Sequence, residues 1–185
     1  LLGYGMSLAA AAGVTPMQGK RAVAVMGDGG FWHNGLLSGV ASNLMNKGNG
    51  VLFIMKNGYA SATGTQELLS SPPEEARMVA VGQSAAGADR TIENTLNGLG
   101  VKWLRTVNNY DVAAMAKTYR EAMTTPEKGL KVIVAEGECQ LERQRRLRPV
   151  VAEKLRRGER HVRVKYGVDE DTCTGDHSCI RLSGC

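Results

Sequence analysis

Two oxygen-bearing side chains stand directly after short apolar runs of the sequence. Asp28 lies in a glycine-rich turn after the run at residues 23–26, and Asn57 follows the run at residues 51–55. If both runs are parallel strands joined by one helix, their carboxyl ends meet at one edge of a sheet, where open α/β sheets bind ligands. Carboxylate and carboxamide oxygens beside a helix N-terminus suit a hard cation that holds a phosphate.

Each of these two residues has a plainer explanation when it is considered alone. A Gly-Asp-Gly sequence is a common turn, and Asn57-Gly58 is a frequent hairpin signal. Together they are harder to explain as unrelated turns, because each ends an apolar run and one helix-like segment separates them. The pair therefore indicates a shared site.

The surrounding pattern predicts an α/β fold with a doubly wound parallel sheet. Apolar runs of strand length alternate with segments of helical periodicity. The expected strands are residues 23–26, 51–55, 101–107 and 131–135, and the expected helices are residues 6–12, 36–44, 91–99 and 112–123. The glycine- and proline-rich stretch 57–89 is expected to be an irregular loop that wraps a ligand. The helix at 36–44 is expected because Leu36, Leu37, Val40 and Leu44 recur at helix spacing.

Charge and composition exclude some classes of function. The net charge is +5, yet residues 141–165 hold ten Lys or Arg against three Asp or Glu, so the basic character belongs to one segment. No aromatic residue is interleaved with these arginines, which favours a solvated helix face or a surface for an acidic partner over a nucleic-acid site. No apolar run has the length of a transmembrane helix. We therefore expect a cytoplasmic protein without a membrane or nucleic-acid partner.

The last thirteen residues contain three of the four cysteines. Cys173, Cys179 and Cys185 resemble part of a ferredoxin run, with Asp176 where a further cysteine would stand. A carboxylate is a poorer ligand for cluster iron than a thiolate, so the run predicts either a labile iron or a lost cluster. Zinc held by these cysteines with Asp176 or His177 is the alternative. Cys139 has no partner nearby in the sequence and is expected to be a plain thiol.

These patterns divide the 185 residues into three parts. Residues 1–140 are expected to form a diphosphate- and cation-binding domain, residues 141–165 a basic linker, and residues 166–185 a small tail that starts an iron–sulfur segment. The sequence opens without Met and stops at Cys185, so we expect a fragment of a longer polypeptide.

The motif around Asp28 and Asn57 resembles that of the enzymes that bind thiamine diphosphate. In that family Gly-Asp-Gly is followed, beyond the next strand, by Asn, and Mg²⁺ joins these residues to the cofactor's diphosphate. The resemblance implies that the Asp28 carboxylate, the Asn57 side chain and the backbone carbonyl of Tyr59 ligate Mg²⁺. The preference of Mg²⁺ for oxygen ligands shared with phosphate agrees with this set.

Two further stretches are similar to the 2-oxoacid:ferredoxin oxidoreductases in particular. These are Phe31-Trp32-His33 and Thr63-Gly64-Thr65-Gln66, and the nearest likeness is to the thiamine-binding subunit of indolepyruvate ferredoxin oxidoreductases. The cofactor-binding residues that the resemblance implies are Gly27, Asp28, Gly29, Phe31, His33, Asn57, Tyr59, Thr63 and Gln66. For His33 the alternative is packing against Trp32, and Thr63 and Gln66 could instead shape a polar loop.

The resemblance implies oxidative decarboxylation of a 2-oxoacid, such as the arylpyruvate indolepyruvate, to an acyl-coenzyme A. Iron–sulfur clusters would pass the electrons to ferredoxin. No residue of the chain resembles the glutamate that activates the cofactor's pyrimidine, so a further domain or subunit would supply that half, and an oligomer is expected. The alternatives are a non-oxidative thiamine-diphosphate decarboxylase or carboligase, which the cysteine tail disfavours, and a non-catalytic electron-transfer or metal-binding module.

Overall fold

The computed structural model describes residues 6–71, 90–162, 167–171 and 173–177. The chain divides into two compact units, Leu1–Arg145 and Arg146–Cys185. The predicted division into residues 1–140, 141–165 and 166–185 stays a prediction.

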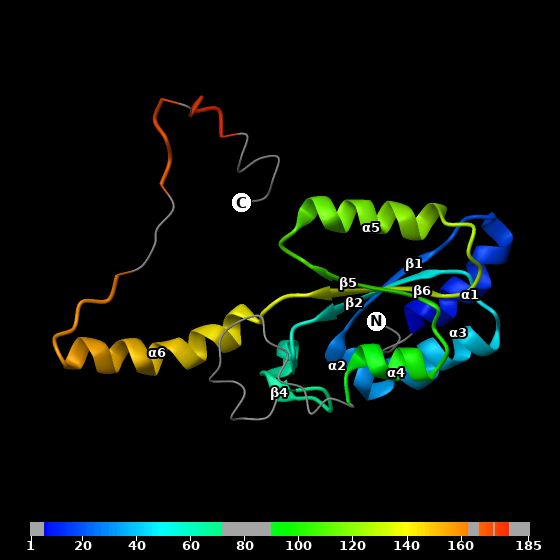
Figure 1. Cartoon of the computed structure of the whole chain (residues 1–185), viewed down its shortest axis with the longest axis horizontal. Coiled ribbons are helices and arrows are strands. Elements are labelled where there is room, and N and C mark those ends of the chain that lie inside the picture. Colours follow the sequence, from blue (N-terminus) through cyan, green and yellow to red (C-terminus); the bar gives the residue numbers. More distant parts are fainter. Residues whose placement is uncertain (1–5, 72–89, 163–166, 172, 178–185) are drawn as a thin grey trace. The chain divides into compact units, whose positions relative to one another are not determined.

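A parallel sheet of four strands lies at the centre of the first unit (Figure 1). Across the sheet the strands are β1 (Val23–Gly27), β2 (Val51–Lys56), β6 (Lys131–Glu136) and β5 (Trp103–Asn108). Every neighbouring pair is parallel. The predicted α/β fold with a parallel sheet is confirmed, and each of the four expected runs forms a strand.

Helices cover both faces of this sheet (Figure 1). One face packs against α1 (Met6–Gln18), against the consecutive helical segments α2 (Asp28–Gly30), η1 (Phe31–Ala41) and α3 (Ser42–Met45), and against α4 (Ile92–Gly98). The other face packs against α5 (Val112–Thr124). The second face is covered less completely: Val23 and Val25 of β1 are 42% and 57% exposed there, whereas Ala24 and Met26 on the first face are buried.

The first helical segments after β1 form one right-handed run over residues 28–45, whose central part is wound as a π-helix. Its turns close with bonds from i to i+5 and are wider than α-helical turns. The segment of Leu36, Leu37, Val40 and Leu44 is helical as expected, but one of the four side chains does not face the core. Leu36, Val40 and Leu44 pack in the core, but Leu37 is 72% exposed, because the wider turn rotates it towards solvent.

The helix expected at residues 6–12 is longer than predicted. α1 continues past Gly13 and Pro16 to Gln18, and it ends at Gly19, whose φ of +64° reverses the chain. A glycine inside a helix costs only about 1 kcal/mol, which the burial of Leu8 and Ala11 offsets. The helices after Thr91 and Asp111 begin as expected, and both side chains accept a capping hydrogen bond from a backbone N–H three residues later.

The stretch 57–89 contains short regular elements in its first part. These are β3 (Tyr59–Ala60), the 3₁₀ turn η2 (Ser61–Thr63) and β4 (Gln66–Glu67), with β3 and β4 antiparallel. Residues 72–89 lie outside the described residues. The predicted basic linker begins as a helix, α6 (Gln140–Arg156), which continues through Pro149. Among the described residues, no helix has the length and apolar character needed to cross a membrane.

Lys131 is the first residue of β6, and its side chain is fully buried. Its ammonium donates to the Gly129 carbonyl oxygen (2.9 Å) and to the Asn49 side chain. Burial, with a smaller contribution from the charge of Arg21, lowers the pKa of Lys131 to about 8. The folded chain therefore disfavours the charged form of this lysine.

This burial predicts a pH-dependent stability. The unfolded lysine keeps a pKa near 10.5, so between pH 8 and 10.5 the unfolded chain binds more protons and the free energy of unfolding rises with pH. Across this pH window, the free energy of unfolding of wild type should rise by about 3 kcal/mol relative to that of Lys131→Met. Urea unfolding followed by tryptophan fluorescence measures the difference. Lys102→Met, at an exposed position, is the control for the loss of a positive charge. The prediction is contradicted if the rise of wild type relative to Lys131→Met is no larger than its rise relative to Lys102→Met.

Candidate functional site

Asp28 is the first residue after β1, and its side chain is buried. One carboxylate oxygen accepts from the Gly29 N–H (2.8 Å). The other accepts from the N–H groups of Asn57 (2.8 Å) and Gly58 (2.7 Å), in the turn after β2. The β1–β2 register makes this bridge possible, since it sets Gly27 beside Met55. The carboxylate thus joins the two turns that the sequence places at the carboxyl edge of the sheet.

The Asp28 carboxylate is buried without a basic partner in the described part of the chain. Burial raises its pKa, and the backbone hydrogen bonds from Asn57, Gly58 and Gly29 act in the opposite direction. Backbone N–H groups stabilise the anion but carry no net charge. A divalent cation would supply the missing positive charge, so the electrostatics of Asp28 fit a metal ligand.

Glycine occurs in both turns that the Asp28 carboxylate joins, for a different reason in each. A Cβ added to Gly29 would lie 3.2 Å from both Cα and Cβ of Ala60 in β3. Gly58 has a φ of +87°, which residues with a side chain rarely adopt. Gly29 therefore permits the close approach to β3, whereas a Cβ at Gly58 would meet no atom within 4 Å and glycine is favoured there by the backbone conformation alone.

Asn57 and Tyr59 bring two further oxygens to the same place. The Asn57 Oδ1 accepts from the Tyr59 N–H (3.1 Å) and from the Ser61 hydroxyl (3.0 Å). The Ser61 Oγ also lies 3.4 Å from the Tyr59 carbonyl oxygen. The Ser61 hydroxyl is therefore within reach of the Asn57 and Tyr59 oxygens that are predicted to be ligands. Asp28, Asn57 and Tyr59 thus lie close together in the structure. A carboxylate, a carboxamide and a backbone carbonyl fit Mg²⁺.

The other predicted cofactor residues occupy different environments. Gly27 is the residue before the helical run, and His33 is exposed near the start of that run. The Phe31 side chain is fully buried in the core against Trp32, so only its backbone could face a ligand. Thr63 and Gln66 bond to each other across their turn, with Gln66 Nε2 donating to the Thr63 carbonyl (2.7 Å). Their contacts with a cofactor stay predictions.

The cysteine tail is only partly described. Cys173 is exposed, and the Asp176 carboxylate accepts from the Thr174 hydroxyl (3.0 Å). Cys179 and Cys185 lie outside the described residues. Within the described residues, no three His, Cys, Asp or Glu side chains are grouped so that they could hold a metal ion.

Sequence reasoning missed three features next to this site. Ser61 is one, and the buried Cys139 is another, with its Sγ 3.4 Å from the Ser61 Oγ. The third is Lys56, whose ammonium pairs with Glu93 (2.9 Å) and Glu136 (3.2 Å). Burial lowers the pKa of Lys56, but its two partners outweigh burial and the net shift is upward. Of these three features, only Lys56 gave a signal in the sequence, because it is a lysine at the end of an apolar strand and next to Asn57.

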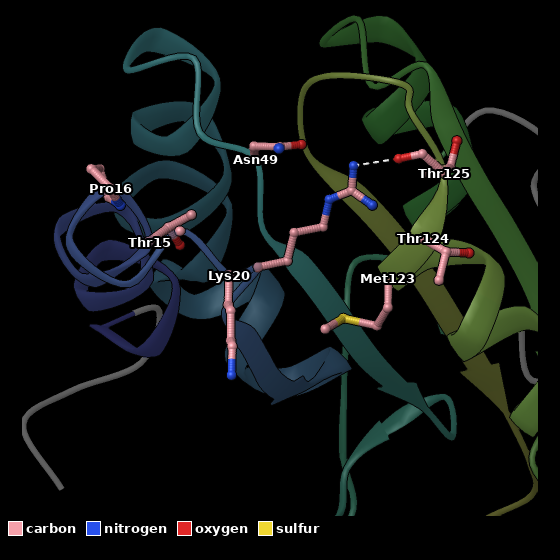
Figure 2. Close-up of a pocket in the computed structure, with 9 residues that line it drawn as sticks. Thr15, Pro16, Lys20, Asn49, Met123, Thr124 and Thr125 are labelled. Atoms are coloured by element: carbon pink, nitrogen blue, oxygen red, sulfur yellow. Dashed lines mark hydrogen bonds between the residues drawn. The ribbon is translucent and has the colours of Figure 1, made fainter.

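A pocket of about 590 Å³ lies at the opposite edge of the sheet (Figure 2). Its residues precede β1 and β2 or end helices α1 and α5, and they are Thr15, Pro16, Gly19, Lys20, Arg21, Asn49, Met123, Thr124 and Thr125. Arg21 donates to the carbonyl oxygens of Ala122 (2.9 Å) and Thr125 at the end of α5. Cations that bond helix C-terminal carbonyls stabilise the helix end. The arginine in this pocket therefore has a structural function.

Comparison with known protein families identifies the family of this chain. Residues 1–135 match the family model of the thiamine pyrophosphate enzyme, C-terminal TPP binding domain. The chain belongs to the thiamine pyrophosphate enzymes. Asp28, Asn57 and Tyr59 all lie inside the matched region, as does the whole four-stranded sheet except the last residue of β6.

Relatives of this thiamine pyrophosphate enzyme domain are found among archaeal proteins. The chain is 28% identical over its whole length to the indolepyruvate oxidoreductase subunit IorA of Thermococcus kodakarensis, and 27% identical over 98% of its length to that of Pyrococcus abyssi. It spans 26% of the length of each. A 2-oxoglutarate:ferredoxin oxidoreductase from Magnetococcus marinus, with 2-oxoglutarate, coenzyme A and succinyl-CoA bound, shares the fold, with a TM-score of 0.56 at 20% identity. That match covers 74% of this chain and 46% of the other.

The close approach of Gly29 to Ala60 predicts that this thiamine pyrophosphate enzyme domain tolerates a side chain at Gly27 but not at Gly29. Gly29→Ala should cost about 1–3 kcal/mol of stability, because the added methyl group would press against Ala60 of β3. Gly27→Ala is the matched control, since a Cβ there meets no atom within 4 Å. Chemical denaturation in the absence of the cofactor measures the stability of both variants. Equal behaviour of the two would show that the turns are not tightly packed.

Proposed function

We propose that this chain holds the diphosphate end of thiamine diphosphate through a Mg²⁺ ion at the carboxyl edge of the sheet. The Asp28 carboxylate, the Asn57 carboxamide oxygen and the Tyr59 carbonyl oxygen are its protein ligands. The observation that carries the proposal is the bridge from the buried Asp28 carboxylate to the backbone of Asn57 and Gly58. In a thiamine pyrophosphate enzyme domain, that bridge brings an uncompensated negative charge to the edge where parallel sheets bind ligands.

The helical run that begins at Asp28 supports the same placement of the diphosphate. The N-terminus of a helix favours anions through its free N–H groups and its dipole. Gly27 and Gly29 lack side chains that would keep a phosphate from the backbone, and His33 is exposed one turn further along. We propose that these residues contact the diphosphate, and that Thr63 and Gln66 lie beside the bound cofactor.

Thiamine diphosphate, when bound, supplies a nucleophilic carbon and an electron sink for cleaving the bond between the carboxylate and keto carbons of a 2-oxoacid. This chain's own residues bind and orient the cofactor at its diphosphate end. None of them is proposed to transfer a proton to the substrate. A further domain or subunit is proposed to supply the pyrimidine-binding half and its activating glutamate.

We propose that the complete protein is a 2-oxoacid:ferredoxin oxidoreductase that forms an acyl-coenzyme A. The names of the relatives support this proposal, as does the shared fold with an oxidoreductase whose structure contains coenzyme A and succinyl-CoA. The same names favour an arylpyruvate, such as indolepyruvate, as the substrate. Cytoplasmic location, an oligomeric assembly and ferredoxin as the electron acceptor complete the proposal.

The metal site predicts a loss of cofactor binding in Asp28→Asn. The substitution removes the charge and turns an amide N–H₂ towards backbone N–H groups that need an acceptor, so the affinity for Mg²⁺ with thiamine diphosphate should fall about 100-fold or more. Isothermal titration of the complete protein measures it. Asp111→Asn, which keeps an N-cap acceptor at the start of α5, is the matched control. Unchanged affinity in Asp28→Asn would reject the site.

The tail gives an independent prediction about metal content. We propose that Cys173, Cys179 and Cys185, with Asp176, hold an iron–sulfur cluster. The reduced complete protein should show an iron–sulfur signal in electron paramagnetic resonance that diminishes in Cys173→Ser and persists in Cys139→Ser. Stoichiometric zinc, with that signal unchanged in Cys173→Ser, would show that the tail is a zinc site instead.

A further inference from the structure

The carboxamide oxygen of Asn57 has two donors and no free lone pair. An amide oxygen accepts two hydrogen bonds, and here they come from the Tyr59 N–H (3.1 Å) and the Ser61 hydroxyl (3.0 Å). The Tyr59 N–H fixes which end of the amide is oxygen, because a backbone N–H needs an acceptor. Before this oxygen can bind a cation, one of its two donors has to withdraw.

Ser61 is the donor that can withdraw. The N–H of Tyr59 belongs to the backbone of β3 and points in a fixed direction, whereas a hydroxyl hydrogen rotates about the C–O bond. Its single proton has three acceptors in reach: the Asn57 Oδ1 (3.0 Å), the Tyr59 carbonyl oxygen (3.4 Å) and the Cys139 Sγ (3.4 Å). Two of the three are proposed cation ligands. Among these contacts of the described residues, the thiol sulfur is the acceptor that remains available when both bind a cation.

The backbone holds Cys139 at this distance from Ser61. The N–H of Gly137 donates to the Lys56 carbonyl oxygen (3.0 Å), which fastens the segment after β6 to the residue before Asn57. Cys139 is 7% exposed, so its sulfur is largely shielded from water, whereas Ser61 is half-buried. A sulfur is a weak acceptor, which suits an alternative partner that must not capture the hydroxyl permanently.

We propose that the Ser61 hydroxyl is a rotatable gate on the cation site. It donates to Asn57 until a divalent cation binds, and then it turns to the Cys139 sulfur. The inference rests on the proposed function of Asn57 as a cation ligand. Ser61 thereby weakens cation binding, and Cys139 restores part of that affinity by accepting the hydroxyl hydrogen bond. Both are positioning residues, and neither is itself a ligand.

The gate predicts shifts of opposite sign for two neighbouring substitutions. In Ser61→Ala no hydrogen bond has to be broken, so the cation should bind about three- to tenfold more tightly. In Cys139→Ala the hydroxyl loses its alternative acceptor, and binding should weaken about threefold. The double variant should bind as tightly as Ser61→Ala, because the thiol acts only through the hydroxyl. Cys139→Ser, which keeps an acceptor, should bind nearly as well as wild type.

Titration of the complete protein with Mn²⁺ at saturating thiamine diphosphate measures these affinities without relying on turnover. Room-temperature electron paramagnetic resonance reports free Mn²⁺ directly, and thermal unfolding of each variant excludes a general loss of structure. The proposal is rejected if Ser61→Ala binds Mn²⁺ more weakly than wild type. It is also rejected if Cys139→Ala has the same effect in wild type as in Ser61→Ala.

Asp28→Asn separates the two proposals. If it abolishes Mn²⁺ binding while Ser61→Ala changes nothing, the gate is rejected and the cation site stands. If Asp28→Asn leaves Mn²⁺ binding intact, both proposals are rejected.

Discussion

The buried carboxylate of Asp28 is the constraint on which the arrangement of this site depends. An anion out of water is costly unless hydrogen bonds satisfy it, and three backbone N–H groups do so here. Two of them belong to the turn after β2, so the carboxylate can be satisfied only while the two strand ends lie side by side. The register between β1 and β2 and the absence of a side chain at Gly29 follow from the same requirement. Fold and site thus share one interaction.

Charge is divided between the two edges of the sheet. At the amino edge, the cationic side chains of Arg21 and Lys131 donate to carbonyl oxygens near the end of α5 and the start of β6. At the carboxyl edge, Lys56 is held by Glu93 and Glu136, while the neighbouring Asp28 has only backbone donors within the described residues. A divalent cation is therefore attracted to one edge and not to the other. This division explains why the pocket at the amino edge is not the candidate site.

The features that local pattern determines were predictable from the sequence. Four apolar runs gave the four strands, and the position of Asp28 and Asn57 after two of them predicted that they meet. The register of η1 was not predictable, because π-winding depends on tertiary packing and moved Leu37 out of the core. The contact of Ser61 with Cys139 was hidden for another reason: it joins residues 78 positions apart, and nothing in either segment indicates the other.

The outer edge of β1 has a consequence for handling this chain. Among the described residues β1 pairs only with β2, and its sequence from Val23 to Gly27 contains no charge, proline or bulge that would discourage another strand. Natural edge strands normally carry such protection, and unprotected ones associate edge to edge. Val23 and Val25 add exposed apolar surface beside the open hydrogen-bonding groups. Prepared alone, the chain therefore presents an aggregation-prone edge, and its solubility depends on what covers β1.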